Sequence, residues 1–404
     1  MEYKGIEYLR RKLAQKELRA RKRYLYYEMK YHVKDFEIST PPGLREYMNV
    51  LGWCGKAVDS LADRLVFREF AQDNFDLTEI YLQNNADILF DGAILSALIT
   101  ACCFIYISED EEGYPRMQVI DGRRATGIID PITNMLTEGY AVLAVDSNNN
   151  PTLEAYFTKG RTDYFRKGHN KPESYVNDAP YPLLVPVIFR PDPVRPFGHS
   201  RISRACMDIV QSAVRTIKRS EIAAEFYSFP QKWVSGTSQD AEPLNKWKAT
   251  MSTLIEITKD DSGDRPTFGQ FAQQSMTPHM EQLKMFASIF AAETGLTMDD
   301  LGFPTENPSS AEAIKAAHEN LRLTARKAQK AFGSGFLNAG YLAACVRDKY
   351  PYQRRQIYLT KPKWEPVFEA DAAALSSYGD GAIKINQAIP GYIDEEKMRD
   401  ITGL

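Results

Sequence analysis

Residues 302–321 read GFPTENPSSAEAIKAAHENL and join a proline-rich loop directly to the start of a strong helix. Ser309 stands where a helix N-cap would stand, and Glu312 follows three residues later, which is the spacing of a capping box. Pro308 prevents the helix from extending upstream because proline has no amide proton to donate. The stretch therefore predicts a sharply defined loop followed by a helix from about residue 310.

Upstream of this loop, the sequence predicts two long helices, 200–227 and 278–294, that flank a compact insert. The first carries an apolar stripe at helical spacing, for example Ile202, Ile209 and Val210. The insert, 229–275, reads as a strand at 229–236, a helix at 241–254, and a strand, an acidic turn and a second strand within 255–271. The order predicts a helical hairpin with a small module at its tip.

The remaining segments predict an α+β region. On its N-terminal side we expect helices at 5–32, 44–65 and 76–98, a short strand at 66–70, a strand at 102–110, and further short strands up to 189 that form an antiparallel sheet. On its C-terminal side, the helix from residue 310 should end near residue 332 because glycines stand at 333 and 335. A further helical stretch at 341–346, a strand at 354–366 and a helical tail at 367–404 follow, the tail broken at 379–381 and at 390–391.

Bulk composition is that of a folded protein without strong global charge. The chain has 404 residues, 25% charged and 44% hydrophobic side chains, and a formal net charge of −3. Its five cysteines fit no disulfide framework or zinc spacing, which predicts reduced thiols in a cytosolic setting. The N-terminus is charged and does not resemble a signal peptide. The longest uncharged run, 92–107, is too short for a bilayer span and predicts a buried helix running into a strand.

Catalytic, cofactor and metal motifs are missing from the sequence. The GWCGK stretch at 52–56 lacks the spacing and the hydroxyl residue of a phosphate loop. No GxSxG or HExxH motif occurs, and the aspartates at 260, 261 and 264 do not have calcium-loop spacing. We therefore expect no catalytic residue, no cofactor and no metal site.

A dense run of basic residues marks the N-terminal helix 5–32. Eight lysines and arginines between residues 10 and 23 face only two glutamates, Glu7 and Glu17. The charges predict either a solvated face or a surface that meets phosphate or an acidic partner protein. The sequence leaves open which of these applies.

Four segments together resemble the portal proteins of tailed bacteriophages, of the siphophage type. YYEMKYHV (26–33) is similar to the close of the first helix in that family, although Met29 replaces its usual glycine. GWCGKAVDSLADRLVFREF (52–70) resembles an early helix entering a sheet, although Glu69 departs from the family pattern. Residues 189–236 resemble the Gly-x-Ser-x-Ile junction and long stem helix, and 295–321 resemble the most specific family segment, a Leu-Gly loop followed by Asn-Pro-Ser-Ser-Ala-Glu-Ala.

The resemblance implies a portal-like α+β fold with a wing, a two-helix stem, a small α/β clip and a short helical crown. Its implied boundaries are the N-terminal wing 1–198, stem helix 199–228, clip 229–275, second stem helix 276–295, tunnel loop and crossing helix 296–335, C-terminal wing 336–370 and crown 371–404. It also implies a non-enzymatic ring of about twelve subunits at one capsid vertex, assembled in the host cytoplasm, through which double-stranded DNA is packaged and later ejected. No membrane is implied.

Implied partners are the major capsid protein, the large subunit of terminase, and a head-completion or adaptor protein. The clip would contact the motor or the adaptor, and the residues expected there are Lys232, Trp233, Lys246, Trp247, Lys259, Asp260, Asp261, Asp264 and Arg265. The tunnel loop would border the DNA channel, and the residues expected there are Asp299, Asp300, Thr305, Glu306, Asn307, Ser309, Ser310 and Glu312.

The acidic residues of this loop suggest a physical role for the junction. Each lysine or arginine contact with phosphate adds affinity for DNA, whereas an acidic edge repels phosphate and lets the duplex slide. The alternative is a well-capped helix on an ordinary polar surface. For the whole chain, the alternatives are a metal-dependent nuclease, which would need converging carboxylates, and a capsid scaffold or adaptor without a channel.

Overall fold

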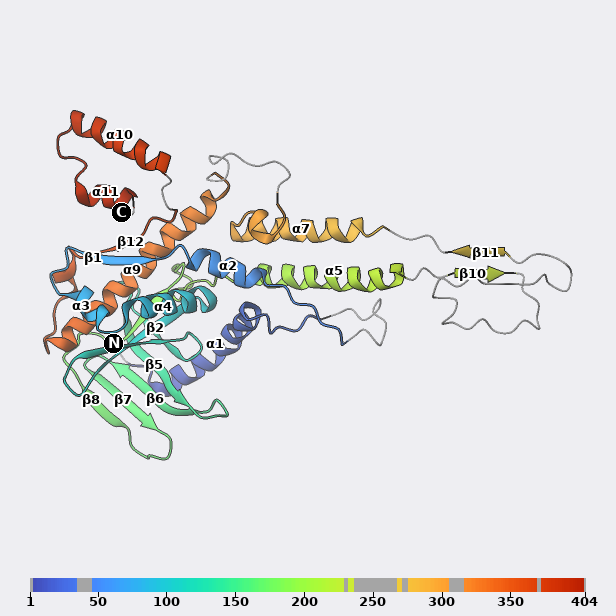
Figure 1. Cartoon of the computed structure of the whole chain (residues 1–404). Coiled ribbons are helices and arrows are strands. Elements are labelled where there is room, and N and C mark those ends of the chain that lie inside the picture. The colour runs from blue at the N-terminus through green and yellow to red at the C-terminus, as the bar shows by residue number, and fades with distance from the viewer. Residues whose placement is uncertain are drawn as a thin grey trace. The chain divides into compact units, whose positions relative to one another are not determined.

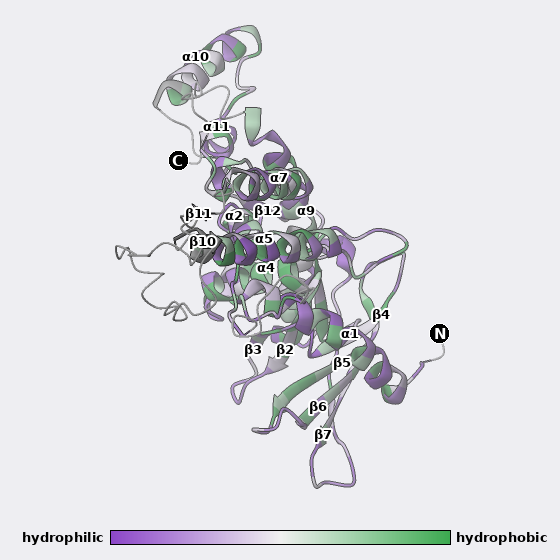
Figure 2. Cartoon of the chain, turned by 90° about the vertical axis from the view of Figure 1, so that its right-hand side faces the viewer, coloured by the Kyte–Doolittle hydropathy of each residue, from purple (hydrophilic) through white to green (hydrophobic). Residues whose placement is uncertain are grey.

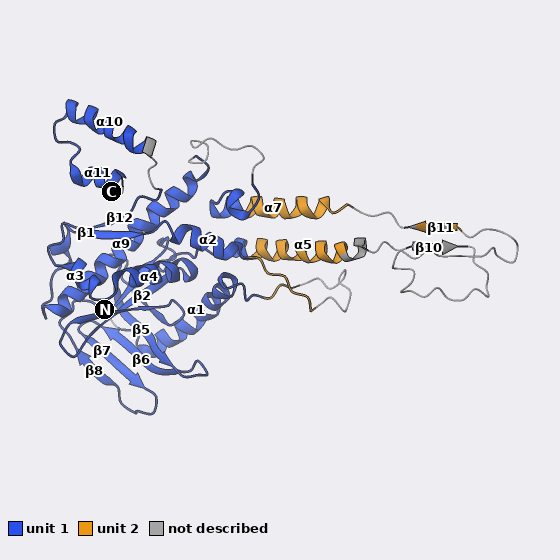
Figure 3. Cartoon of the chain, in the orientation of Figure 1, with its two compact units in different colours: residues 1–31, 52–207, 291–404 blue, residues 32–51, 208–290 orange. Residues whose placement is uncertain are grey.

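A computed structural model of the chain describes residues 3–34, 46–228, 232–235, 267–270, 275–304, 316–368 and 372–402. The chain divides into two compact units, coloured separately in Figure 3. Unit 1 comprises residues 1–31, 52–207 and 291–404, and unit 2 comprises residues 32–51 and 208–290. Helices and strands occur together in unit 1, which confirms the α+β class. The predicted capping box at 309–312 and the predicted helix at 241–254 lie outside the described residues.

One layer of unit 1 is a five-stranded antiparallel sheet with the strand order β4-β5-β6-β7-β8. Helix α1, Ile6–Tyr27, packs on it, and Leu9 and Leu13 form a buried cluster with Tyr140 and Val142 of β5. No side chain of α1 caps the helix, but the Glu138 carboxylate accepts hydrogen bonds from the amides of residues 4 and 5 at 2.8 and 3.0 Å. A carboxylate at a helix N-terminus is favourable because it meets the positive end of the helix dipole. The strands are β4 Ala125–Ile129, β5 Leu136–Val145, β6 Pro151–Thr158, β7 Arg161–Arg166 and β8 Glu173–Val176.

A three-stranded antiparallel sheet, ordered β3-β2-β9, forms the second layer. Its central strand β2 is buried along Cys102–Ile107. Cys103 donates to the carbonyl of Ala93 in α4, whereas Tyr106 meets Tyr164 of the five-stranded sheet. Because successive side chains of a strand point to opposite faces, β2 is covered on both sides. The uncharged run 92–107 is therefore a buried helix that leads into a strand, as predicted. The elements are α4 Ala86–Thr100, β2 Cys102–Glu109, β3 Pro115–Ile120 and β9 Leu184–Ile188.

A two-stranded sheet pairs the early strand β1, Phe67–Ala71, with the late strand β12, Lys361–Trp364. Phe67 lies at the centre of an aromatic cluster with Phe90, Phe336 and Trp364, with ring centroids 4.3–5.9 Å apart. This cluster joins early and late parts of the sequence into one core, as the closeness of β1, β12 and α9, Glu319–Arg347, in Figure 1 also shows.

Two C-terminal helices, α10 Ala372–Ala388 and α11 Glu395–Thr402, follow β12. None of their described side chains is buried. Asp400 of α11 instead forms ion pairs with Arg68 of β1, at 2.9 Å, and with Lys363 of β12. The attachment of α11 to the two-stranded sheet is therefore largely ionic.

Helix α9 runs without interruption from Glu319 to Arg347, so the predicted end at Phe332 is wrong. A β-carbon on Gly333 would meet the ring of Pro362 at 2.7 Å, and one on Gly335 would meet Val187 of β9 at 3.2 Å. The glycines are therefore positions of close packing against β12 and β9 rather than a stop signal. Helical stretch 341–346, predicted separately, belongs to this same helix.

We expect Gly333→Ala to destabilise the protein by about 1–3 kcal/mol, although alanine is the better helix former, because the proline ring cannot make room. The matched control is Gly379→Ala inside α10, where a β-carbon would meet nothing within 4 Å. That change should stabilise α10 by about 0.5–1 kcal/mol. Thermal unfolding of both variants measures the difference, and equal shifts would contradict the packing explanation.

Three further predicted helices differ from the observed ones. Helix α1 ends at Tyr27 rather than at residue 32. Helix α2 begins at Trp53 rather than 44, because the side-chain amide of Asn49 instead donates to Glu221 of α5, Arg204–Ser228, at 2.7 Å. The helix predicted at 76–98 is divided into α3 Leu77–Leu82 and α4. The side chain of Asn84 makes the division, since its amide oxygen accepts from the amide of Met117 in β3 at 2.8 Å. The bounds of α2 are Trp53–Ala62.

Two C-terminal predictions also need correction. Residues 354–366 do not form one strand: a 3-10 helix, Arg354–Ile357, precedes the short β12. Gln353 caps that 3-10 helix reciprocally with Gln356, which diverts the chain before the strand. Helix α10 continues through residues 379 and 381, where nothing crowds the backbone, so the predicted break there is wrong. The predicted break at 390–391 is confirmed, because α10 ends at Ala388 and α11 begins at Glu395.

Unit 2 contains most of α5, Arg204–Ser228, most of α7, Thr277–Thr294, and the hairpin of β10, Lys232–Ser235, with β11, Thr267–Gln270. Thr216 of α5 and Gln282 of α7 are hydrogen-bonded at 3.0 Å, which fixes the pairing of the two helices. Both predicted helices are confirmed. The participation of residues 46–51, which lie along α5, was not predicted.

Candidate functional site

The turn that precedes α5 is built around Gly198. Its φ is +74°, and a β-carbon there would lie 2.1 Å from the carbonyl oxygen of Phe189. The next amide, that of His199, donates to this same oxygen at 2.9 Å. The imidazole of His199 and two backbone amides hold the carboxylate of Asp192, which lowers the pKa of that carboxyl. The end of β9 is thereby folded back onto the start of α5.

Ser200 and Arg201 then fix the turn to unit 1. The Ser200 hydroxyl donates to the carbonyl of Ile99 at 2.6 Å. Arg201 is only 7% exposed, and its backbone amide donates to Leu98 at 2.8 Å. Its guanidinium donates to the carbonyl of Ala57 at 3.1 Å and to that of Thr294. One buried side chain therefore joins α2, the start of α5 and the end of α7.

Burial lowers the pKa of Arg201 to about 10, so the guanidinium remains charged at neutral pH. The Thr294 carbonyl belongs to the last turn of α7, where the helix dipole places negative charge, and a cation there is favourable. The sequence identified the surrounding Gly-x-Ser-x-Ile pattern but not this arginine. An arginine between a serine and an apolar residue was the available signal, whereas its acceptors are backbone carbonyls that no side-chain pattern marks.

The segment after α7 is a compact turn. Helix α7 ends at Thr294, as predicted, and Gly295 follows it with a φ of +70°. Asp300 accepts from the amide and the hydroxyl of Thr297, both at 2.9 Å, and a short 3-10 helix, Asp299–Leu301, follows from this turn. Leu301 is 8% exposed and anchors the segment to unit 1. The start of the predicted tunnel loop is therefore locally well defined.

The structure places only some of the predicted site residues. Asp299 is exposed, whereas Asp300 is half-buried, and its carboxylate lies 3.8 Å from the His318 ring. Lys232 and Trp233 lie on β10, opposite Gln270 and residue 269 of β11. The remaining expected residues lie outside the described ones, namely Thr305, Glu306, Asn307, Ser309, Ser310 and Glu312 of the tunnel loop, and Lys246, Trp247, Lys259, Asp260, Asp261, Asp264 and Arg265 of the clip.

Half of the basic side chains of α1 face inward, which the sequence did not predict. Arg10 forms an ion pair with Glu154 at 2.6 Å, and this hydrogen bond raises the pKa of Arg10. The remaining inward-facing residues have neutral partners: Lys12 donates to the carbonyl of residue 127 at 2.7 Å, Lys16 to the sulfur of Cys102 at 2.9 Å and Arg23 to the carbonyl of Thr100 at 3.2 Å. Burial lowers the pKa of Lys12 and of Arg23. These four side chains attach α1 to the rest of unit 1. Only the basic residues on the outer side of α1 are therefore available to bind a partner.

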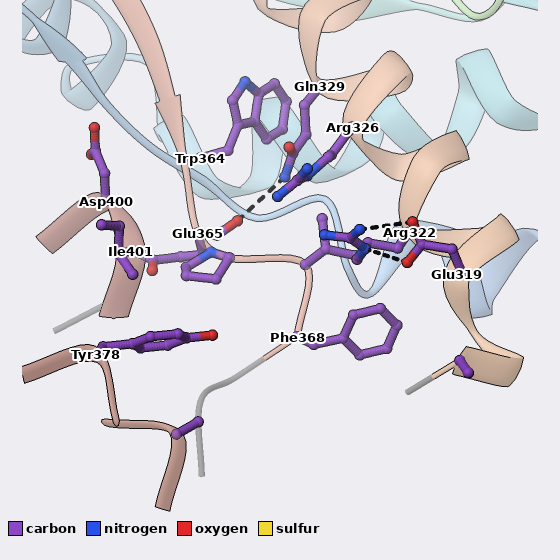
Figure 4. A pocket seen from close by; sticks show the side chains of 14 residues that line it. Glu319, Arg322, Arg326, Gln329, Trp364, Glu365, Phe368, Tyr378, Asp400 and Ile401 are labelled. Atoms are coloured by element: carbon purple, nitrogen blue, oxygen red, sulfur yellow. Dashed lines mark hydrogen bonds and ion pairs between the residues drawn. The ribbon is translucent and has the colours of Figure 1, made fainter. Parts of the chain in front are cut away.

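A cavity of about 820 Å³ lies between α9, the segment after β12 and the C-terminal helices (Figure 4). Arg322 is bound to Glu319 by two hydrogen bonds of 2.7 Å, and Gln329 donates to the carbonyl of Glu365 at 3.3 Å. No histidine, cysteine, serine or lysine stands among the described residues that line it.

Within the described part of the chain, no group of histidine, cysteine, aspartate and glutamate side chains is arranged to hold a metal ion. The five cysteines are all free and buried, so they do not form disulfides with one another. No helix among the described residues is both long enough and apolar enough to cross a membrane.

Comparison with known proteins gives one family. A model of the family described as "Phage portal protein, SPP1 Gp6-like" matches residues 7–374. The portal protein of Mycobacterium phage L5 is 24% identical, over 93% of this chain and 80% of its own. That of Mycobacterium phage D29 is also 24% identical, over 94% and 81%.

Two solved structures are similar in backbone arrangement. A chain from the virion of a native gene transfer agent particle has a TM-score of 0.45 and 13% identity, with 87% of this chain and 89% of that chain covered. A chain from the neck of a native gene transfer agent particle, computed with C12 symmetry, has a TM-score of 0.46 and 15% identity, with 87% and 91% covered.

Proposed function

Because the chain belongs to the SPP1 Gp6-like family of phage portal proteins, a structural and non-enzymatic family, we propose that it forms a ring-shaped DNA channel at one capsid vertex. Genomic double-stranded DNA would enter the head through this ring during packaging and leave through it during ejection. The observation that carries the proposal is the family match across residues 7–374. Assembly would take place in the host cytoplasm, and the ring would remain in the virion.

In this proposal, each part of the chain corresponds to one part of the ring subunit. Helices α5 and α7 would form the stem, and the β10–β11 hairpin would belong to the clip, residues 229–275. The layered sheets of unit 1 would form the wing, the segment after α7 would begin the tunnel loop, and α10 and α11 would form the crown. Support for a rigid stem base comes from Arg201, which holds the end of α7 beside the start of α5.

Each surface would have its own partner. The clip, with Lys232 and Trp233 on β10, would contact the large subunit of terminase and later a head-completion or adaptor protein. The wing would contact the major capsid protein, and the ring itself is a homo-oligomer of about twelve subunits. Electron microscopy of the purified chain, with its mass in solution, tests the ring. A chain that stays monomeric even when coassembled with shell proteins would refute the proposal.

The acidic tunnel loop should weaken DNA contacts. The charges chosen for a test are the carboxylates of Asp299, which is exposed, and of Glu306. We expect Asp299→Asn with Glu306→Gln to lower the packaging rate by roughly two- to threefold, because removal of like charge strengthens contact with phosphate. Asp300→Asn, added as a third change, would also disturb the turn at Thr297 and needs its own stability control.

In vitro packaging of phage DNA measures this effect. The control is Glu111→Gln with Glu112→Gln, two exposed carboxylates in the turn between β2 and β3. An unchanged rate and unchanged DNA retention in the tunnel-loop variant would count against an electrostatic role, while leaving the ring itself intact.

A further inference from the structure

The outer face of α1 combines basic and apolar side chains in one stripe. Tyr8, Arg11, Leu18, Lys22 and Leu25 recur at intervals of three, four or seven residues, which places them on one side of the helix. Leu18 is 73% exposed, and Leu25 and Tyr8 are 36% and 37% exposed. Hydrophilic and hydrophobic residues are interspersed along α1, as the colours of Figure 2 show. An ordinary solvated face does not need a leucine exposed to this degree.

The outer cations of α1 are also unpaired. Arg19, Arg21 and Lys22 are exposed, and none forms an ion pair with any described residue, in contrast to the inward-facing Arg10. We name Arg11, Leu18, Arg19, Lys22 and Leu25 the basic face. Its positive charge is not neutralised within the described part of the subunit.

A surface of opposite charge lies elsewhere on unit 1, around the start of α4. Asp87 and Asp91 are exposed one helical turn apart, and the pKa of Asp91 is raised by partial burial and by the charges of Asp87 and of Asp63 at the end of α2. These carboxylates have no ion-pair partner among the described residues. Between them stands Ile88, 77% exposed, and Leu82 of α3 is 68% exposed. We name these five residues the acidic patch.

The two surfaces match in two respects: they have opposite charge, and each has large exposed apolar side chains among its charges. We propose that the basic face of one subunit binds the acidic patch of the next subunit. Such a contact joins two different surfaces of identical chains, so it is head-to-tail and can close into a ring. The proposal rests on the proposed ring and specifies one of its subunit contacts.

Duplex DNA is the other ligand that a basic helix could bind. DNA would explain the arginines and the lysine but not the exposed Leu18 and Leu25, because phosphate contacts are made by charged and polar groups. The apolar side chains and the unpaired acidic patch on the same subunit favour a second copy. DNA binding therefore becomes an outcome of the test.

Charge reversal provides the test. The first variant carries Arg19→Glu and Lys22→Glu, and the second carries Asp87→Lys and Asp91→Lys. In each variant the two surfaces have like charge, so we expect half-maximal assembly to require a concentration at least about tenfold higher than for the wild type. The control, Lys159→Glu with Lys171→Glu, changes two exposed lysines outside both surfaces by the same charge.

Mixing the two reversal variants gives the decisive result. Every contact in an alternating mixture pairs opposite charges again, so an equimolar mixture should assemble like the wild type. A chain with all four substitutions should assemble alone. Mass photometry gives the assembly state, and circular dichroism shows that each variant is folded.

Several outcomes would overturn the contact. These are reversal variants that assemble as the wild type does, or a mixture and a fourfold variant that both remain dissociated. Loss of duplex DNA binding in the first variant, without recovery of assembly in the mixture, would instead assign the basic face to DNA. If the wild type forms no ring, the proposed function fails. Association of the two reversal variants in the mixture would still show whether the basic face binds the acidic patch.

Discussion

Arg201→Ala is expected to lower the free energy of unfolding by about 3–5 kcal/mol, because it leaves two carbonyls without a charged donor and opens a cavity. The guanidinium is buried and donates to Ala57 in α2 and to Thr294 in α7. Hydrogen bonds to a charged group contribute about 1.5–3 kcal/mol each. Urea unfolding followed by tryptophan fluorescence measures the loss, and Trp53, four residues before Ala57 in α2, is a suitable reporter.

Two further variants separate the explanation from a general effect of removing an arginine. Arg355→Ala removes an exposed arginine in the 3-10 helix before β12 and should change stability by less than about 0.5 kcal/mol. Arg201→Lys retains the charge but not the forked donors, so it should recover only part of the loss. If Arg201→Ala is as stable as Arg355→Ala, the guanidinium does not hold the two helices together.

The second large effect is expected at Gly198. We expect Gly198→Ala to cost about 3 kcal/mol, as the sum of about 1–2 kcal/mol for a left-handed backbone and about 1–3 kcal/mol for overpacking. Overpacking applies because the new β-carbon would lie 2.1 Å from the Phe189 carbonyl oxygen, which is backbone and cannot rotate away. The turn would have to open, and α5 would begin elsewhere.

Gly168→Ala is the matched control for this substitution. Gly168 also has a left-handed φ, +89°, but a β-carbon there would meet nothing within 4 Å. It should therefore show the cost of the backbone conformation alone, about 1–2 kcal/mol. Thermal unfolding of both variants gives the difference, and similar losses at the two glycines would show that the close approach to Phe189 does not matter.

Periodicity predicted much of this fold. Strand β2 and the short strands after it follow from alternating or continuous apolar residues bounded by glycine, aspartate and proline, and α5 follows from its apolar stripe. The predicted helix bounds were wrong where tertiary contacts outweighed a local sequence signal. The glycines at 333 and 335 indicate a helix end by themselves, yet in α9 they allow contact with Pro362 and Val187. Asn84 divides a predicted helix because it pairs with β3, a strand more than thirty residues away.

The candidate site was predictable in part. The Gly-x-Ser-x-Ile junction was identified through its resemblance to the corresponding segment of the family. The partners of Arg201 could not be predicted, since each is a backbone carbonyl contributed by a distant helix. The inward side of α1 could not be predicted for a similar reason. Lys12 and Arg23 donate to backbone carbonyls, so no acidic residue at helical spacing indicated that these two side chains are partly buried.

The C-terminal helices make part of the chain responsive to ionic strength. Most of unit 1 is held by buried apolar side chains, which salt does not weaken, whereas α11 is held to the two-stranded sheet through Asp400 with Arg68 and Lys363. The Debye length falls from about 8 Å at physiological salt to about 3 Å at 1 M. Molar salt should therefore release α10 and α11 for proteolysis while the sheets remain folded, so that salt concentration selects which part of the subunit a protease can cut.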